Sequence, residues 1–194
     1  MAVTHECRVS YVHVFEAQKN DLSGEMEYSV VGIFPANTDF TSMKKDAEEA
    51  LVKKFGADKK NWPENLRNPF RKCKERWSMK DGKQVIPAGY ENGDDVFITF
   101  KKAAKNGKPG VVDHNVMDII EPQHFYSGCY AKISYNAYAF DKKGNKGAGF
   151  GLNNIQKTRD GDPLGGRSRP TDDFKPVEGA GAAAGGAGAG SVFD

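Results

Sequence analysis

A long alternating stretch from Cys129 to Asp141 constrains the fold of this chain more than any other feature. Successive side chains of a β-strand point to opposite faces, so a period of two divides this segment into two sets. One set is small or apolar and suits the inside of a tight barrel, whereas the other mixes aromatic and polar residues. The predicted inward set is Ala131, Ile133, Tyr135, Ala137 and Ala139, and the outward set is Tyr130, Lys132, Ser134, Asn136, Tyr138 and Phe140.

The residues after this strand predict a hairpin. The sequence DKKGNKG at 141–147 has the glycine and asparagine content of a turn, and GAGFGLNNIQ at 147–156 is a plausible returning strand. Residues 94–102 repeat the alternation, and residues 7–15 and 28–34 predict two earlier strands. In the segment 94–102 the predicted inward residues are Val96, Ile98 and Phe100, and the outward ones are Phe97 and Lys101.

One helix is predicted between the early strands and the later ones. Apolar residues recur at helical spacing from Thr41 to Gly56, with Thr41 or Ser42 as N-cap candidates and Gly56 in the position of a C-cap glycine. Residues 57–93 contain prolines and glycines without clear periodicity, which predicts a long loop with short elements. The fold class is therefore mainly β with one clear α-helix and long loops.

Charge is distributed unevenly along the chain. Residues 1–64 hold 8 basic and 11 acidic residues, whereas residues 65–170 hold 19 basic and 11 acidic ones. From residue 171 onward there is one lysine against four acids. A strongly basic middle indicates a polyanionic partner, and the acidic end could compete with that partner for the same surface.

Basic clusters lie next to aromatic residues, which is typical of a groove that binds single strands by stacking and counterion release. The clusters are Arg67, Arg71, Lys72, Lys74 and Arg76; Lys101, Lys102, Lys105 and Lys108; and Lys142, Lys143, Lys146, Lys157 and Arg159. A charge run alone is usually only a solvated face, so the combination with aromatics carries the argument. The predicted DNA-binding residues are Tyr130, Lys132, Asn136, Tyr138, Phe97, Lys101, Lys102, Lys105, Arg71, Trp77, Lys142, Lys143, Lys146, Phe150 and Arg159.

Catalytic and metal-binding chemistry finds little support. The four histidines and three cysteines do not have metal-ligand spacing, and GNKGAGFG lacks the GK[ST] ending of a nucleotide-binding loop. The acids of RDGDPLGG at 159–166 lack the later ligands of a calcium loop. A metal-dependent nuclease site at Asp113, Asp118 and Glu121 remains a weaker alternative. We therefore predict no catalytic residues, no metal and no cofactor.

The cysteines and both ends of the chain bear on location and organisation. Cys7, Cys73 and Cys129 are odd in number and widely spaced, which fits a reducing compartment and predicts a cytoplasmic location. Neither a leader nor a membrane-spanning run is indicated. Residues 179–190 are only glycine and alanine, so we expect a folded domain at 1–174 and a flexible, disordered tail at 175–194.

Four blocks of sequence resemble a tailed-phage single-stranded DNA-binding family that was formerly catalogued as a domain of unknown function. They are NPFR at 68–71, PGVVD at 109–113, FYSGCYAKISYNAYAFDKKGNKG at 125–147 and GLNNIQKTRDGDPLGGR at 151–167. The resemblance implies an OB-type barrel and a role in phage DNA replication or recombination, within the host cytoplasm. It also implies that binding requires no cofactor. It gives no list of contact residues, so the residues named above come from strand faces and charge.

We therefore predict a sequence-tolerant protein that binds and protects single-stranded DNA without catalysis. Replication or recombination proteins could meet the tail at TDDF, residues 171–174, or at the terminal SVFD, and a homo-oligomer is possible. The alternatives are a phage structural or partner-binding protein, which would use the outward aromatics as a protein interface, and a nuclease.

Overall fold

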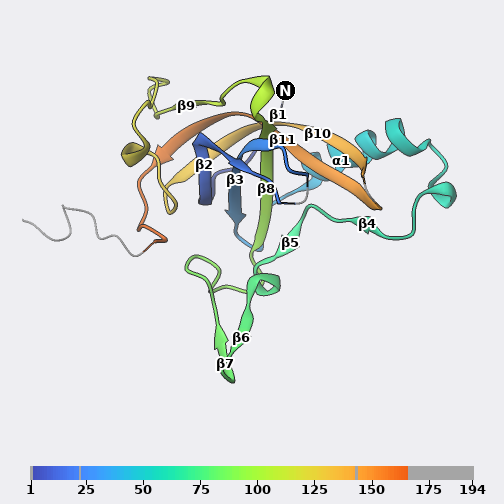
Figure 1. Ribbon diagram of the computed structural model, residues 1–194, viewed down its shortest axis with the longest axis horizontal. Helices are drawn as coiled ribbons and strands as arrows, with labels where there is room; N and C mark the ends of the chain where they lie inside the picture. The colour runs from blue at the N-terminus through green and yellow to red at the C-terminus, as the bar shows by residue number, and fades with distance from the viewer. Residues whose placement is uncertain (1, 22, 143, 166–194) are drawn as a thin grey trace, which may run out of the picture.

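Strands β2, β3, β8, β11 and β10 close into a barrel in this computed structural model, which describes residues 2–21, 23–142 and 144–165 (Figure 1). Consecutive pairs in that ring are antiparallel except β8 and β11, which run parallel. This order is the five-stranded OB topology. The strands of the ring are β2 (Cys7–Lys19), β3 (Met26–Phe34), β8 (Val96–Ala103), β10 (Tyr130–Lys142) and β11 (Asn145–Arg159).

Shorter elements extend the sheet or connect its strands. The short strands β1, β4, β5 and β9 pair with strands of the ring, while β6 and β7 form a separate hairpin. Their bounds are β1 (Ala2–Val3), β4 (Leu66–Arg67), β5 (Arg71–Lys72), β6 (Ser78–Lys80), β7 (Lys83–Val85) and β9 (Gly110–Val112). Single turns of 3-10 helix are η1 (Lys59–Asn61), η2 (Cys73–Arg76), η3 (Ala104–Asn106) and η4 (Pro122–His124).

The barrel interior confirms the predicted alternation of the long strand as far as Ala137, whereas Ala139 is half-buried and lies outside the core cluster. Ala131, Ile133 and Tyr135 are fully buried, and Ala137 packs against the same core. The narrow interior explains the small residues, because aromatic rings from several strands already fill it. Edge-to-face contacts join these rings, such as Tyr135 with Phe150 at 5.2 Å between ring centroids.

Helix α1 (Thr41–Phe55) packs against β10 and β11. It buries Met43 and Ala47 in the barrel core, and Gly56 ends it with φ 92° and a backbone hydrogen bond to Val52, as predicted. The N-cap prediction is wrong, since Phe40 occupies the N-cap position and no side chain caps the helix. The Asp39 carboxylate instead accepts bonds from the Thr41 amide and hydroxyl, which fixes the chain just before the helix.

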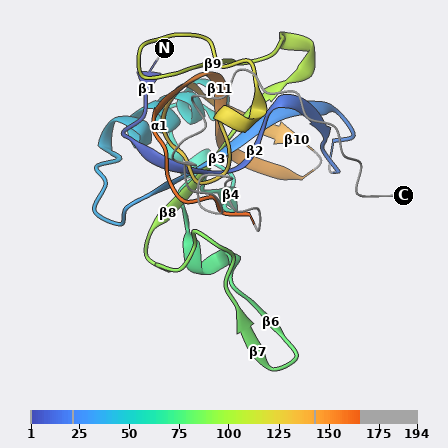
Figure 2. The same cartoon turned by 90° about the vertical axis from the view of Figure 1, so that its left-hand side faces the viewer.

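The segment between α1 and β8 is a long insertion with short elements, as predicted. Its β6–β7 hairpin projects away from the barrel in two perpendicular views (Figures 1 and 2). The base of the insertion covers part of the outer face of β3 and β8. There Cys73, Tyr90 and Phe97 form a second buried cluster with Val31 and Ile33. The insertion therefore has a small core of its own, outside the barrel.

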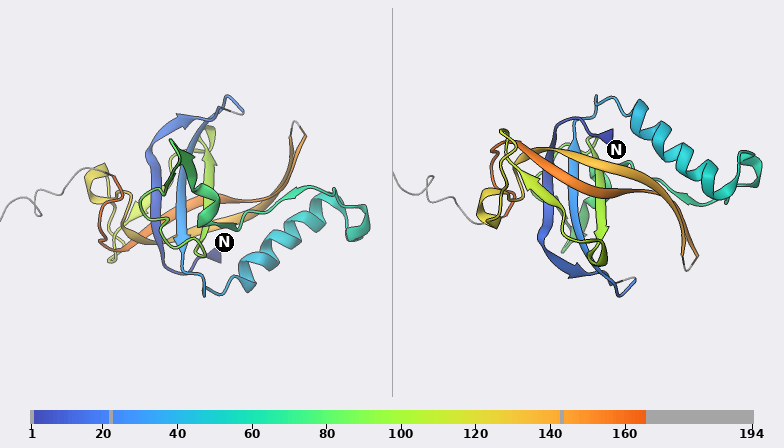
Figure 3. Two further views of the ribbon diagram at one scale, coloured as in Figure 1. Left: turned by 90° about the horizontal axis from the view of Figure 1, so that it is seen from below. Right: turned by 90° about the horizontal axis from the view of Figure 1, so that it is seen from above.

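The β10–β11 hairpin also extends beyond the barrel, on the same side as α1 (Figure 3). In the part of the chain that the structure describes, no helix is long and apolar enough to cross a membrane. The predicted tail at 175–194, the end of the predicted domain at 166–174, and Lys143 lie outside the described residues.

Candidate nucleic-acid interface

A row of polar side chains crosses the outer face of the barrel. Cross-strand pairs place His13 beside Ser29, Ser29 beside Lys101, Lys101 beside Gly151, and Gly151 beside Asn136. The middle of this row lies on β3 and β8, the second and third strands of the ring, and OB proteins use the outer face of these two strands to bind oligonucleotides. Two of the predicted contacts, Lys101 and Asn136, are thereby brought together on one surface.

Tyr138 lies next to this row, over a glycine. A Cβ atom built on Gly149 would stand 2.9 Å from the Tyr138 ring, so the absence of a side chain there lets the ring lie against β11. Gly151 stands in the same relation to the Asn136 amide. The Tyr138 side chain remains 37% exposed. Partial burial raises the pKa of its hydroxyl, and the Glu27 carboxylate adds to that effect.

Lys101 is paired within the protein. Its Nζ lies 2.5 Å from a Glu27 carboxylate oxygen, and both side chains are only partly exposed. The negative charge of the same carboxylate also raises the pKa of the Tyr138 hydroxyl. Glu27 therefore supplies a negative charge at the centre of an otherwise cationic and aromatic surface.

Tyr11 is a second exposed aromatic residue on this face, and it is not among the predicted contacts. It lies in an irregular part of β2, between the pairs Ser10–Val31 and His13–Ser29, with φ 47°. A positive φ is rare for an aromatic residue, and bulges of this kind redirect side chains near functional sites. The ring is 44% exposed and lies 4.9 Å from the Arg76 guanidinium.

The burial pattern along β2 in the structure marks the Tyr11 bulge. Cys7 and Val9 are buried at odd positions, whereas Val14 is buried at an even one. This change of phase requires an extra residue between Val9 and Val14, which is the definition of a bulge.

Phe97 does not form part of the accessible surface. It points away from the barrel interior as predicted, but the insertion covers it and leaves it 2% exposed. The guanidinium groups of Arg71 and Arg76 lie 5.1 and 4.8 Å from its ring. The prediction of Phe97 as a stacking residue is wrong because the two arginines and Tyr90 already occupy its surroundings.

Phe150 was also predicted incorrectly. It faces into the barrel, is 1% exposed, and packs against Phe70, Phe100 and Tyr135. Its position between Gly149 and Gly151 assigns it to the inward set of β11. No base can reach this ring in the folded protein.

Trp77 lies at the root of the β6–β7 hairpin and is half-buried. Its indole N–H donates a 2.8 Å bond to the Tyr90 carbonyl, and its ring packs over Gly93. These contacts give Trp77 a structural role in holding the hairpin root.

Tyr130 and Arg159 form a separate site at the other end of β10 and β11. The Arg159 guanidinium lies 3.3 Å from the centroid of the Tyr130 ring, and its Nε is 3.3 Å from a Glu6 oxygen. With Arg8 they line a cavity of about 310 Å³. Tyr130 and Tyr138 are eight residues apart on one strand, roughly 26 Å, so they do not share one small site.

The remaining predicted lysines lie around the edges of the barrel. Lys132 and Lys105 are exposed, and Lys102 is half-buried beside the Lys108 carbonyl. Lys142 is exposed at the β10–β11 tip, where Lys146 pairs with Asp141 at 3.3 Å. The structure thus divides the predicted basic clusters among several surfaces.

The acids proposed for a nuclease do not form a metal site. Within residues 2–21, 23–142 and 144–165, no three histidine, cysteine, aspartate or glutamate side chains are grouped to hold a metal ion. Asp113 instead accepts hydrogen bonds from the Asn115 and Met117 amides. The hydrogen bond from the Met117 amide is the largest cause that lowers the pKa of the Asp113 carboxyl.

A closed OB barrel with exposed tyrosines and basic residues on its outer face defines the class of oligonucleotide-binding proteins. The chain belongs to the family described as the single-stranded DNA-binding protein of Enterobacter phage Enc34, whose sequence profile matches residues 1–184.

Solved structures of phage proteins have the same fold. The Enc34 single-stranded DNA-binding protein, in complex with single-stranded DNA, aligns with a TM-score of 0.61 and 18% identity over 84% of this chain and 88% of the other. Bacteriophage T7 gp2.5, a single-stranded DNA-binding protein, aligns with a TM-score of 0.55 and 14% identity over 87% and 96%. No curated protein sequence is significantly similar to this chain.

Proposed function

We propose that this protein binds single-stranded DNA without catalysis, across the outer face of β3, β8 and β11 between Tyr11 on β2 and Tyr138 on β10, during phage DNA replication or recombination. One observation carries the proposal. Among the aromatic side chains that the structure describes, the two exposed ones, Tyr11 on β2 and Tyr138 on β10, flank the outer face of β3 and β8, which are the second and third strands of the ring and form the face that OB proteins use for oligonucleotides.

The proposed mechanism combines stacking with charge. Bases stack on the Tyr11 and Tyr138 rings, and Lys101 and Arg76 neutralise phosphates between them. From β2 to β11 the face is three strand spacings wide, or roughly 15 Å, which leaves room for a short extended strand between the two rings. Stacking depends on the π-face that every base has, so the binding tolerates any sequence.

Family membership supports this proposal over a role as a structural protein. The Tyr130–Arg159 site and the lysines at the barrel edges would extend the path of the strand beyond the central face. Binding of this kind keeps a strand open and protected for other enzymes. It requires no chemical step, and we propose none.

Fluorescence anisotropy with labelled single-stranded and duplex oligonucleotides tests the proposal. We expect tighter binding to the single strand, because paired bases cannot stack on the protein. Affinity should fall with added salt, with a slope of about 0.7 in log units for each phosphate contacted.

The same titration includes magnesium or manganese to test the nuclease alternative. We expect the probe to stay intact. Equal affinity for both forms of DNA, or no binding to either, would contradict the proposed function, and loss of the probe would favour a nuclease.

A further inference from the structure

The β6–β7 hairpin and Ile86, which follows it, carry three exposed apolar side chains. We call this segment, residues 78–86, the arm. Met79, Val85 and Ile86 are 69%, 43% and 40% exposed. An isolated two-stranded hairpin is only marginally stable in water, yet this one carries apolar residues away from the barrel (Figures 1 and 2). Exposed apolar residues on both faces of a projecting element indicate a partner that encloses it.

The register of the arm shows what kind of partner would fit it. Met79 pairs with Gln84, whereas Val85 pairs with Ser78, so apolar side chains lie on both faces. Lys80 and Lys83 stand directly opposite each other, an arrangement that repels and that nearby carboxylates would relieve. Residues 78–86 contain no aromatic side chain to stack on a base.

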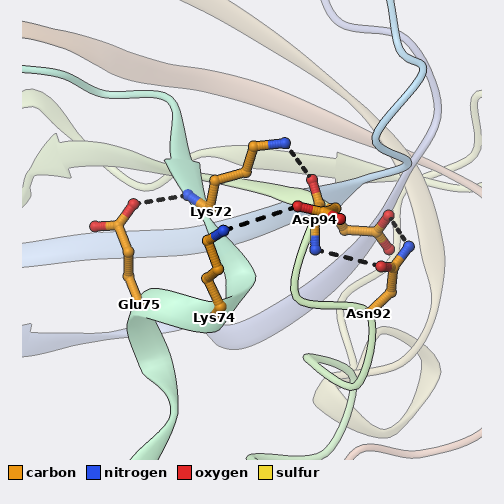
Figure 4. Close-up of polar contacts among 6 residues, drawn as sticks. Lys72, Lys74, Glu75, Asn92 and Asp94 are labelled. Carbon is orange, nitrogen blue, oxygen red and sulfur yellow. Dashed lines mark hydrogen bonds and ion pairs between the residues drawn. The ribbon is translucent and has the colours of Figure 1, made fainter.

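The arm is held firmly at its root (Figure 4). The Cys73 and Lys74 amides donate to the carbonyls of Asp95 and Gly93 at 2.8 and 3.1 Å. The Lys72 ammonium donates a 2.6 Å bond to the Asp94 carbonyl. At the other end, Asp81 and Gly82 both have positive φ, as a two-residue hairpin turn requires. The arm is therefore preorganised to bind, which lowers the entropy lost on docking.

A second apolar patch lies on the loop after β9, residues 113–121, which we call the acidic loop. Val116, Met117 and Ile120 are 68%, 66% and 79% exposed. The loop also carries Asp113, Asp118 and Glu121 and contains no lysine or arginine. It borders a cavity of about 520 Å³.

The backbone of the acidic loop is fixed with its apolar side chains outward. The Asp113 carboxylate accepts bonds from the Asn115 and Met117 amides at 2.8 and 2.9 Å. Val116 has φ 64°, which is unfavourable for a β-branched residue and persists only where the surroundings hold it. The acidic loop is therefore an ordered surface that carries exposed apolar residues and negative charge.

We propose that the arm of one copy of this protein docks on the acidic loop of a second copy. Among the described residues, the two patches hold six of the ten exposed large hydrophobic side chains. Their net charges are opposite, because the arm carries Lys80 and Lys83 against Asp81 alone, whereas the acidic loop carries three carboxylates and no lysine or arginine. The patches lie at opposite ends of the molecule in both perpendicular views.

Contact between two different surfaces leaves one of each free, so further copies can add, and along an extended DNA strand they form an open chain in place of a closed ring. Such a chain lines copies up along one strand of DNA and makes binding cooperative. This inference rests on the proposed function, because the DNA supplies the shared track.

Two oligonucleotides separate docking from DNA contact: a short oligothymidine that holds one copy and a long one that holds several. We expect wild-type protein to bind each site of the long strand on the order of 10-fold more tightly. The variant Lys80→Glu/Lys83→Glu should lose this advantage and keep its affinity for the short strand. Asp118→Lys/Glu121→Lys should behave in the same way, since both variants oppose like charges at one contact.

Combining the four substitutions reverses both patches and should restore the advantage of the long strand to within about 3-fold of wild type. Lys53→Glu/Lys54→Glu on helix α1 is the matched control for charge and should keep it fully. The proposal is overturned if the combined variant fails to recover, or if the arm variant binds the short strand more weakly than this control. Failure of the proposed function itself would appear as wild-type protein that does not bind the short strand.

Discussion

Glu27 is the residue of the candidate interface whose negative charge repels the phosphates of single-stranded DNA. Its carboxylate pairs with Lys101 at 2.5 Å and lies near Tyr138, so an approaching phosphate must displace this carboxylate from Lys101 and is repelled by its negative charge. A negative charge that weakens the binding of DNA can also make the release of DNA faster. The stacking residues on either side of Glu27 bind bases through their rings, and no such opposing charge acts on that contact. The interface therefore contains two kinds of residue, stacking residues and charged residues.

Glu27→Gln should therefore tighten binding of single-stranded DNA. The substitution removes the repulsion and frees Lys101 for a phosphate, and we expect a gain of about 0.5 to 1 kcal/mol, as for a partly exposed ion pair. Anisotropy titration at low salt measures it, with Glu25→Gln in the adjacent loop as the control. Weaker binding by a folded Glu27→Gln protein would show that the pair positions Lys101 for DNA.

The tyrosine rings should account for most of the stacking energy. Tyr138→Ala and Tyr11→Ala should each cost ~1 to 3 kcal/mol of binding free energy, whereas Tyr138→Phe keeps the ring and should cost little. Titrations with a short oligonucleotide measure these differences, and circular dichroism checks the fold. Equal losses for the Ala and Phe variants at position 138 would mean that the hydroxyl, and not the ring, contacts DNA.

Two glycine-containing elements have different roles. On β11, Gly149 and Gly151 lie on the outer face beneath Tyr138 and Asn136. The segments YSGCY at 126–130 and RDGDPL at 159–164, which belong to the blocks that carry the family resemblance, instead pack against each other, since the Tyr126 hydroxyl donates to Asp160 and the Leu164 amide to the Ser127 carbonyl. Those segments therefore hold each other in place and have a structural role.

Gly149→Ala tests the role of the β11 glycines. The added Cβ would approach the Tyr138 ring to 2.9 Å, so the ring must tilt away from β11. We expect binding weaker by ~1 kcal/mol, part of the energy of one stacked base, with the fold retained. Gly165→Ala is the control, because nothing lies within 4 Å of a Cβ there. Unchanged affinity of Gly149→Ala would remove the glycines from the interface.

The whole molecule has two hydrophobic cores, a large one inside the barrel and a small one beneath the insertion. Cys7 and Cys129 lie in the barrel core, whereas Cys73 lies in the small cluster beneath the insertion. Burial raises the pKa of all three thiols, that of Cys73 to about 11. All three are therefore protonated and unreactive at pH 8 in the native state, since the thiolate is the nucleophile.

Alkylation should report the order in which the two cores open. In urea below the main unfolding transition we expect iodoacetamide to modify Cys73 first, because the small cluster opens at lower free energy than the barrel. Mass spectrometry of peptides measures the three rates, and denatured protein gives the fully reactive reference. Simultaneous modification of Cys7, Cys73 and Cys129 would show that insertion and barrel unfold as one unit.

The sequence by itself determined the elements and their faces. Alternation identified the inward residues of β10, helical spacing identified α1, and charge identified the basic middle of the chain, because each of these signals is local. The tertiary structure decided which outward residues remain accessible. Phe97 faces out but lies under the insertion, Phe150 faces in, and Tyr11 reaches the surface through a bulge. Exposure depends on segments far apart in the sequence, so no local pattern could place the interface.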